Sequence, residues 1–175
     1  MSCTLTLGRK EPCKDTVGGL KAVYFTDFGD YGTVTETDDE ITDLTGTFTA
    51  FKYELKGNSS FEQAITSSRE NGTTFFDQTL TLTLKKLSKE DNKELKLLAY
   101  GRPHVAVEDY NGNVFVMGLQ HGAEVTGGTV STGAAMADLS GYTLTLNAQE
   151  VKPANFVNAP TAADPFAGIL NKISF

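Results

Sequence analysis

The longest alternation of apolar and polar side chains in this chain runs through residues 73–86, TTFFDQTLTLTLKK. One face of the predicted strand carries Phe76, Gln78, Leu80, Leu82 and Leu84, and the other carries Phe75, Asp77, Thr79, Thr81 and Thr83. At roughly 3.3 Å per residue this strand would extend about 46 Å, whereas an ordinary strand has about five or six residues. We therefore predict a strand that overruns a small core and whose excess length needs a partner.

Further strands are predicted where short runs alternate, or are apolar throughout, between turn residues. These runs are residues 18–28, 47–55, 60–71, 104–118, 123–133 and 140–150. In the first of them, Leu20 is expected on the same face as Ala22 and Tyr24, and opposite Val23 and Phe25.

Two turn signals fix how some of these strands pair. Residues 60–71 also suit a short helix, but the Asn71-Gly72 turn favours a strand that pairs with residues 73–86. The run 104–118 contains Asn111-Gly112 between two apolar stretches, which predicts a tight hairpin.

One amphipathic helix is predicted over residues 88–100. Ser88 can accept a hydrogen bond from the backbone N–H of Asp91 and so cap the helix. The helix ends before Gly101 and Pro103. Its apolar face is narrow and consists of Leu95 and Leu98, widened by Leu97, so we expect it to pack on one sheet.

Composition supports a mainly β fold in one domain, residues 1–175, with an N-terminal arm (1–18) and a C-terminal tail (151–175). Thr and Gly are abundant, Trp is absent and 39% of the residues are hydrophobic. The net charge of −7 argues against tight nucleic-acid binding, which depends on Lys and Arg. It is compatible with a conduit through which DNA slides.

No catalytic constellation is found, so we expect no enzyme activity and no cofactor. The two histidines, His104 and His121, have no ligand spacing that would pair them with Asp109 or Glu124 around a metal ion. The acidic stretch 29–46 lacks the residue order of a calcium loop. We interpret it as a solvated hairpin tip.

The N-terminal residues contain no apolar stretch typical of a signal peptide, and no apolar run is long enough to cross a bilayer. Cys3 and Cys13 are too few and too local for a disulfide framework. We expect two reduced thiols in a protein made in a cytoplasm, without membrane insertion.

Three long segments carry a resemblance to a known group of proteins: GRKEPCKDTVGGLKAVYFTDF, ITDLTGTFTAFKYELKGNSSFEQAITSSRENGTTFFDQTLTLTLKKL and VAVEDYNGNVFVMGLQHGAEVTGGTVSTGAAMADLSGYTLTLNAQEVKPANFV. Over residues 8–157 the chain resembles virion structural proteins of tailed bacteriophages of Bacteroidetes-type hosts, most of all tail tube or tail-ring subunits. The resemblance rests on the order of the predicted strands and on short sequence segments within them, not on a diagnostic motif.

This resemblance implies a β-sandwich or half-open barrel with one packed α-helix. Subunits of this kind form rings, usually hexameric, that stack into a tube, and their sheets join into an inner barrel with an acidic lumen. The implied partners are copies of the chain, adjacent rings, the tail sheath, tape measure and tail terminator proteins, and genomic DNA that passes non-specifically. The implied location is the virion tail.

The resemblance also implies roles for parts of this chain. Strands 60–70 and 73–86 would build the inner barrel, the helix would lie on the outer wall, and the hairpin near 29–55 would reach the next ring. The lumen candidates are Glu62, Glu70, Asp77, Thr79, Thr81 and Thr83. The inter-ring arm candidates are Glu36, Asp38, Asp39, Glu40 and Asp43. Independently, long strands with exposed edges invite other chains, and a closed ring satisfies such edges.

Several alternatives stay open at this point. A head–tail completion ring that does not polymerise and a secretion-system tube have the same sequence properties. A carbohydrate-binding adhesin would need aromatic platforms, for which Tyr31, Tyr53, Tyr100, Tyr110 and Tyr142 are available, although Trp is absent.

Overall fold

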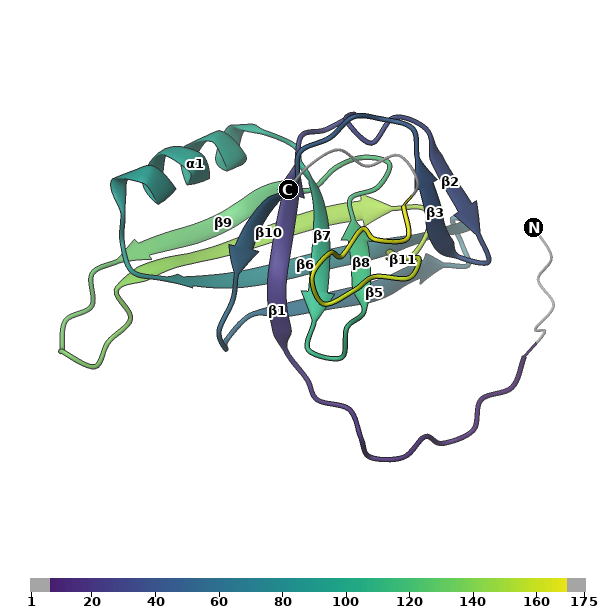
Figure 1. Cartoon of the computed structure of the whole chain (residues 1–175), viewed down its shortest axis with the longest axis horizontal. Coiled ribbons are helices and arrows are strands. Elements are labelled where there is room, and N and C mark those ends of the chain that lie inside the picture. The colour runs from purple at the N-terminus through teal and green to yellow at the C-terminus, as the bar shows by residue number, and fades with distance from the viewer. Residues whose placement is uncertain (1–6, 170–175) are drawn as a thin grey trace.

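The computed structural model describes residues 7–169, which form two β-sheets and one helix (Figure 1). The elements in chain order are β1 (Leu20–Thr26), β2 (Val34–Thr37), β3 (Glu40–Leu44), β4 (Phe51–Glu54), β5 (Ser60–Ser68), β6 (Thr73–Lys85), α1 (Lys89–Tyr100), β7 (His104–Asp109), β8 (Val114–Met117), β9 (Glu124–Ser131), β10 (Gly141–Glu150) and β11 (Asn155–Val157). The predicted mainly β sandwich with one packed helix is confirmed.

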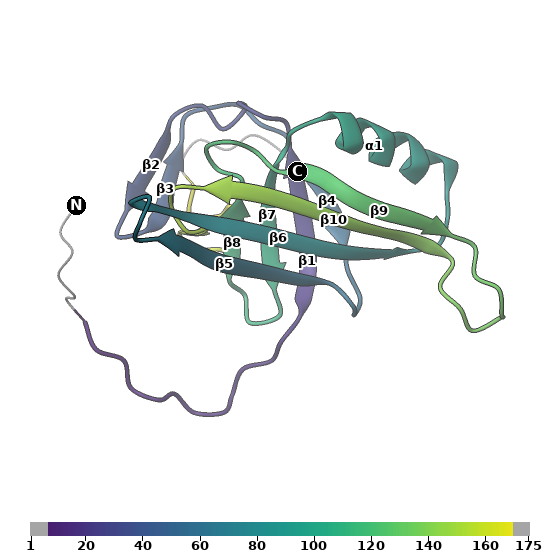
Figure 2. The ribbon, with the colours of Figure 1, turned by 180° about the vertical axis from the view of Figure 1, so that it is seen from behind.

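The strands divide into a seven-stranded sheet, in the order β2-β3-β11-β8-β7-β1-β4, and a four-stranded sheet, in the order β5-β6-β10-β9. The chain crosses between the sheets after β4, after β6 through α1, after β8 and after β10. Figure 2 shows the four-stranded sheet in front of the seven-stranded sheet, with its long strands across the other strands. All pairs in the four-stranded sheet are antiparallel.

The main core lies between the two sheets. The predicted alternation of β6 is confirmed, because Leu80 and Leu82 are fully buried in this core. Gln78 shares their face, and its side-chain oxygen accepts a hydrogen bond from the Gly118 N–H at 3.1 Å. A polar residue is therefore tolerated inside because its carbonyl is paired.

A second core covers the other face of the seven-stranded sheet. Phe48 packs edge-on against Tyr31 at 5.0 Å between ring centroids and against Phe166 at 5.3 Å. The C-terminal tail contributes to this second core. Phe166 and Ile169 are buried in this second core of their own chain, while residues 170–175 lie outside the described part.

Two expected strand faces differ from the structure. Leu20 belongs to the main core with Val23, not with Ala22, because the register of β1 on β7 shifts between residues 20 and 22. The strand expected over 47–55 spans only Phe51–Glu54. The preceding residues Phe48 and Ala50 instead fill the second core from a loop.

The helix prediction holds at its ends. The Asp91 N–H donates to the Ser88 side-chain oxygen at 3.0 Å, which caps α1, and Gly101 ends it. Leu95 is buried and Leu98 packs on the main core. Leu97, expected to widen the apolar face, is 56% exposed, because it lies over a hollow between α1 and the strands.

Candidate functional site: the four-stranded sheet

The outer face of the four-stranded sheet is lined with hydroxyl groups, and we call it the threonine face. Its central rows follow from the strand register, which places Thr129 opposite Thr143, Thr143 opposite Thr83, Thr145 opposite Thr81, and Thr81 opposite Ser60. No described segment crosses this face in Figure 2. The uncovered face of the sheet is thus polar but mostly uncharged.

Three carboxylates lie together at one end of the threonine face, and we call them the acidic row. Glu62 lies opposite Thr79, and Glu124 lies opposite Asn147. Asp77 lies on the same face of β6, two residues before Thr79. Its carboxylate accepts a hydrogen bond from the Asn147 side-chain amide at 2.6 Å. The predicted lumen candidates Glu62, Asp77, Thr79, Thr81 and Thr83 therefore share one face.

Glu124 was missed in the sequence. Strict alternation along 123–133 assigns Glu124 to the opposite face, because β9 changes register between its pairings to Thr145 and Leu146. This irregularity leaves Thr126 as the extra residue. Only the paired strand β10 shows that Glu124 and Glu62 belong to the same row.

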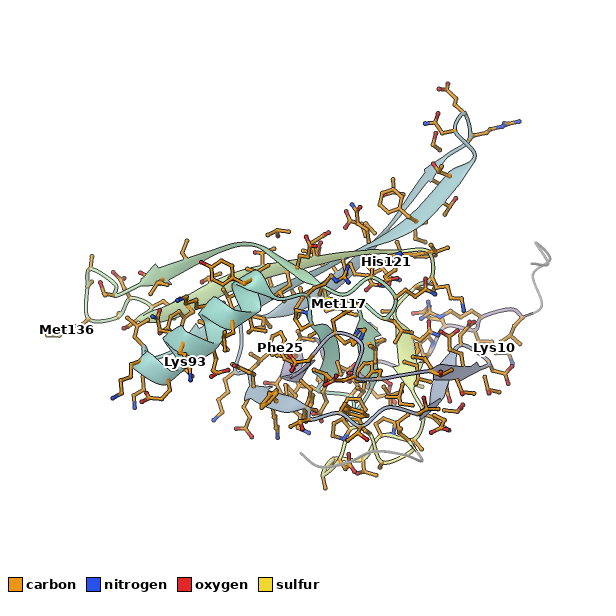
Figure 3. All side chains as sticks on the ribbon, turned by 90° about the horizontal axis from the view of Figure 1, so that it is seen from above. Lys10, Phe25, Lys93, Met117, His121 and Met136 are labelled. Atoms are coloured by element: carbon orange, nitrogen blue, oxygen red, sulfur yellow. The ribbon has the colours of Figure 1, made fainter. Side chains whose placement is uncertain are left out.

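Glu70, the remaining lumen candidate, lies apart from the others. It belongs to the turn between β5 and β6, whose last register pair is Ser68 with Thr73. β10 pairs with β6 only from Phe76 onward, so the end of this hairpin extends beyond the sheet. Figure 3 shows this two-stranded hairpin projecting from the body of the molecule.

Both edges of the four-stranded sheet are unpaired along one side in the described chain. The edge strands β5 and β9 have 9 and 8 residues. Apolar side chains are exposed on both: Ile65 is 69% and Val130 is 64% exposed. Neither strand contains Pro or Lys, the residues that commonly protect an open edge. Each strand thus has a side that can pair with another chain, and α1 contacts β9 beside its edge (Figure 2).

The inter-ring arm candidates gather on the β2–β3 hairpin at the margin of the seven-stranded sheet. Asp38 and Asp39 form its turn with positive φ angles of 54° and 64°. Glu36 accepts a hydrogen bond from the Lys152 ammonium at 2.6 Å. The five predicted residues, Glu36, Asp38, Asp39, Glu40 and Asp43, are thus close together, but much of the remaining segment 29–55 is not a free arm. Ile41 and Leu44 are buried in the second core.

The two histidines serve the fold in different ways. His104 is buried, with Nδ1 2.7 Å from the Gly118 carbonyl oxygen and Nε2 accepting from the Gly29 N–H at 3.1 Å. Burial lowers its pKa, so the neutral ring is favoured. His121 instead lies 3.0 Å from the buried carboxylate of Glu150. Residues 7–169 contain no cluster of three or more His, Cys, Asp or Glu side chains able to hold a metal ion.

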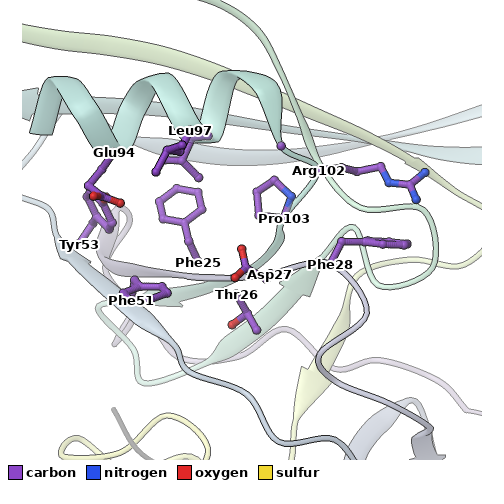
Figure 4. Close-up of a pocket in the computed structure, with 12 residues that line it drawn as sticks. Phe25, Thr26, Asp27, Phe28, Phe51, Tyr53, Glu94, Leu97, Arg102 and Pro103 are labelled. Carbon is purple, nitrogen blue, oxygen red and sulfur yellow. The ribbon is translucent and has the colours of Figure 1, made fainter.

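A hollow of about 250 Å³ lies between α1 and the ends of β1 and β4, and we call it hollow 1 (Figure 4). Leu97 of α1 lies above Phe25, with Phe51 and Tyr53 of β4 beside them. At its margin, the Arg102 guanidinium stacks 3.9 Å from the Phe28 ring centroid. Phe28 in turn stacks on His104. This mostly apolar lining is suited to hold an apolar side chain.

The tyrosines do not form a sugar-binding platform. Tyr31 and Tyr142 are buried, and the Tyr142 hydroxyl donates to the Ser88 carbonyl at 2.9 Å. The exposed Tyr100 and Tyr110 lie at opposite ends of β7. The adhesin interpretation therefore gains no support from the placement of these side chains.

Cys13 is an exposed free thiol, and Cys3 lies outside the described residues. No helix within residues 7–169 has both the length and the apolar character needed to cross a membrane.

Comparison with known proteins found no matching family model, no matching curated protein and no matching solved structure. The function is therefore inferred from the geometry of the sheets and from the sequence.

Proposed function

We propose that this protein is a structural subunit that assembles with its own copies into rings, and that the rings stack as the tail tube of a bacteriophage. The observation that carries the proposal is the four-stranded sheet, with two long open edges and one uncovered hydroxyl-lined face. Such a sheet is completed when β5 of one copy pairs with β9 of the next.

The strand directions permit this junction. Neighbouring strands alternate in direction from β5 through β6 and β10 to β9, so β5 and β9 run in opposite directions. A second copy in the same orientation would therefore add β5 to β9 as another antiparallel pair. This contact joins two different surfaces, and such contacts form a ring when the rotation between copies closes.

The position of the seven-stranded sheet supports an inward threonine face. One face of the four-stranded sheet is covered by the main core and the second sheet. In a closed ring the bulky side of each subunit needs the wider circumference, which places it outside. The threonine face would then line the lumen, and every copy would add Glu62, Asp77 and Glu124 to a belt of carboxylates. Such a belt repels phosphates, so that DNA passes without adhering.

The other implied partners follow from the same proposal. The carboxylates of the β2–β3 hairpin would face an adjacent ring, and the outer surface would contact the sheath in a contractile tail. Tape measure and tail terminator proteins would meet the lumen and the end of the tube. The subunit would be made in the cytoplasm of the bacterial host and be located in the virion tail.

The test uses proline to block one edge. In β9, the backbone N–H groups of alternate residues face the free side. Thr129 and Val130 are neighbours, so one of the variants Thr129→Pro and Val130→Pro removes an outward N–H and leaves the hydrogen bonds to β10 intact. We expect that variant to stay folded and monomeric by sedimentation, while alanine at the same position assembles as the wild-type chain does.

Electron micrographs of the concentrated wild-type protein distinguish the remaining possibilities. Long tubes support a tail tube, and isolated rings support a completion ring. A wild-type chain that stays monomeric when concentrated would contradict the proposal.

A further inference from the structure

A second open edge, outside the four-stranded sheet, has the properties of a peptide-binding site. β4 is the last strand of the seven-stranded sheet and pairs only with β1 among the described strands. The Leu55 N–H donates to the Lys21 carbonyl at 2.9 Å. The register therefore directs the backbone groups of Phe51 and Tyr53 toward β1, and those of Lys52 and Glu54 toward the free side.

Two adjoining hollows lie beside β4, between this strand and α1. Hollow 1, of about 250 Å³, and a second hollow of about 630 Å³, which we call hollow 2, are both lined by Phe51, Tyr53 and Glu94. Phe51 is 55% exposed although it is a large apolar side chain. An unpaired strand beside hollows for alternate side chains is the arrangement by which sheets bind an extended peptide.

The N-terminal arm of the chain contains a segment that fits this site. Thr4–Leu7 has the sequence TLTL, which recurs in β6 as Thr79–Leu82 and in β10 as Thr143–Leu146. In an extended chain, Leu5 and Leu7 lie on one face about 7 Å apart. The two leucines therefore match two neighbouring hollows, while Thr4 and Thr6 would face away from them. Residues 4–6 lie outside the described part, so this step rests on their sequence.

The charges around the site favour the same segment. Arg9 and Lys10 follow directly after Leu7. Asp91 and Glu94 of α1 line hollow 2, together with Lys52, Lys85 and Glu54, whose carboxylate lies 3.2 Å from the Lys52 ammonium. Burial raises the pKa of Tyr53 on β4, and the negative charges of Glu94 and Asp91 raise it further. These carboxylates are therefore close enough to act on β4. The carboxylates of Asp91 and Glu94 are thus available for the basic residues of the arm.

The arm is directed away from β4 of its own chain. Its described residues, from Leu7 to Gly19, are all exposed. At its root, the Val17 N–H donates to the Asn111 side-chain oxygen at 3.0 Å and the Asn111 amide donates to the Val17 carbonyl at 2.8 Å. This pair fixes the arm to the β7–β8 turn, whereas β4 lies on the other side of β1. Figures 1 and 2 both show the arm leaving the body on the side opposite to β4.

We propose that residues Thr4–Leu7 of one copy add as a strand to β4 of a second copy, with Leu5 and Leu7 in hollows 1 and 2. This contact between copies goes beyond the ring proposed above and does not require that β5 and β9 pair.

The experiment separates donor and acceptor in full-length chains. The acceptor is an isotope-labelled chain with Leu5→Asp and Leu7→Asp, which disables its own arm. The donor is an unlabelled chain with Lys52→Pro, which removes an outward N–H of its β4. We expect the amides of Lys52 and Glu54 in the acceptor to exchange with deuterium about tenfold more slowly, or slower still, when donor is added. An added Lys52→Ala change in the acceptor should preserve this protection of the position 52 amide.

Three results would overturn the proposal. The first is exchange at residues 52 and 54 that does not slow with donor. The second is equal slowing by a donor that carries Leu5→Asp and Leu7→Asp. The third is protection of these amides in dilute wild-type chain that does not depend on concentration, which would assign β4 to the arm of its own chain. The ring proposal is tested separately, by the exchange of amides in β5 and β9.

Discussion

At the scale of single residues, buried polar groups are held by specific partners. His104 stacks between Phe28 and Tyr31, with ring centroids 4.9 and 4.6 Å away. Its two nitrogens connect the loop after β1 to the end of β8. Because the Gly118 carbonyl can only accept, Nδ1 carries the proton and Nε2 is the acceptor. Protonating Nε2 would break the hydrogen bond from Gly29.

We predict that the free energy of unfolding falls in mild acid, because protonation of His104 is favoured in the unfolded chain. Burial lowers the pKa of His104 in the folded state, while the unfolded chain protonates near pH 6.5. Its contribution to stability is therefore fully present above pH 6.5 and is lost as the pH falls through the folded pKa. Nearby Glu150 and Asp30 oppose the shift, and Arg102 supports it.

The measurement is the free energy of unfolding by urea between pH 7.5 and 5.5, for the wild-type chain and for His104→Asn. The variant should be less stable at pH 7.5 by about 1–3 kcal/mol, as expected when a buried partner is lost. It should also show a shallower decline toward pH 5.5. Equal slopes for the two proteins would mean that His104 does not carry the effect.

At the scale of elements, each strand or helix has a local reason for its bounds. β6 is long because ten of its positions pair with β10 and nine pair with β5. The β7–β8 turn is held by Asp109, whose carboxylate accepts from the backbone N–H groups of Asn111 and Asn113 at 2.9 and 2.8 Å. α1 begins where the Ser88 side chain satisfies a free N–H of the first turn.

We predict that Ser88→Ala lowers the free energy of unfolding by about 1 kcal/mol, as for other helix caps. Ser88→Asp is the matched control, because its carboxylate can accept the same hydrogen bond and favours the positive end of the helix dipole. Thermal unfolding followed by circular dichroism checks both variants. If Ser88→Asp were as destabilised as Ser88→Ala, the cap would not be the reason for the loss.

At the scale of the whole molecule, the two sheets separate two kinds of surface. The seven-stranded sheet is covered on both faces, by the main core and by the second core. The four-stranded sheet is covered on one face only. Its other face has hydroxyl groups, the acidic row and, at the far end of β6, Lys85. Negative charge on this face is therefore concentrated at one end.

Charge reversal tests whether this face meets DNA in an assembled particle. We predict that Glu62→Lys and Asp77→Lys make assembled particles retain DNA at low salt and slow DNA ejection from virions. Glu70→Lys should have little effect, because Glu70 lies in the projecting turn. Retention measured as a function of salt distinguishes charge from a change in shape. Identical behaviour of all three variants, with intact assembly, would mean that the threonine face does not line the path of DNA.

How far the sequence predicts this molecule depends on whether a signal is local. The two faces of β6, the hairpin around Asn111-Gly112, the helix cap at Ser88 and the mainly β class were all predicted correctly, since alternation, turn chemistry and capping involve residues a few positions apart. The resemblance grouped Glu62 with Thr79 as lumen candidates, and the register places them opposite one another.

Only the tertiary structure decided which strands share a sheet, which edges stay open and what covers each face. The bulges in β1 and β9 reverse the faces of Leu20 and Glu124 relative to simple alternation, because one extra residue changes the parity of everything beyond it. Burial of Phe166 against Tyr31 and Phe48 joins segments more than a hundred residues apart. Such contacts are set by packing between distant parts of the chain, and no local pattern encodes them.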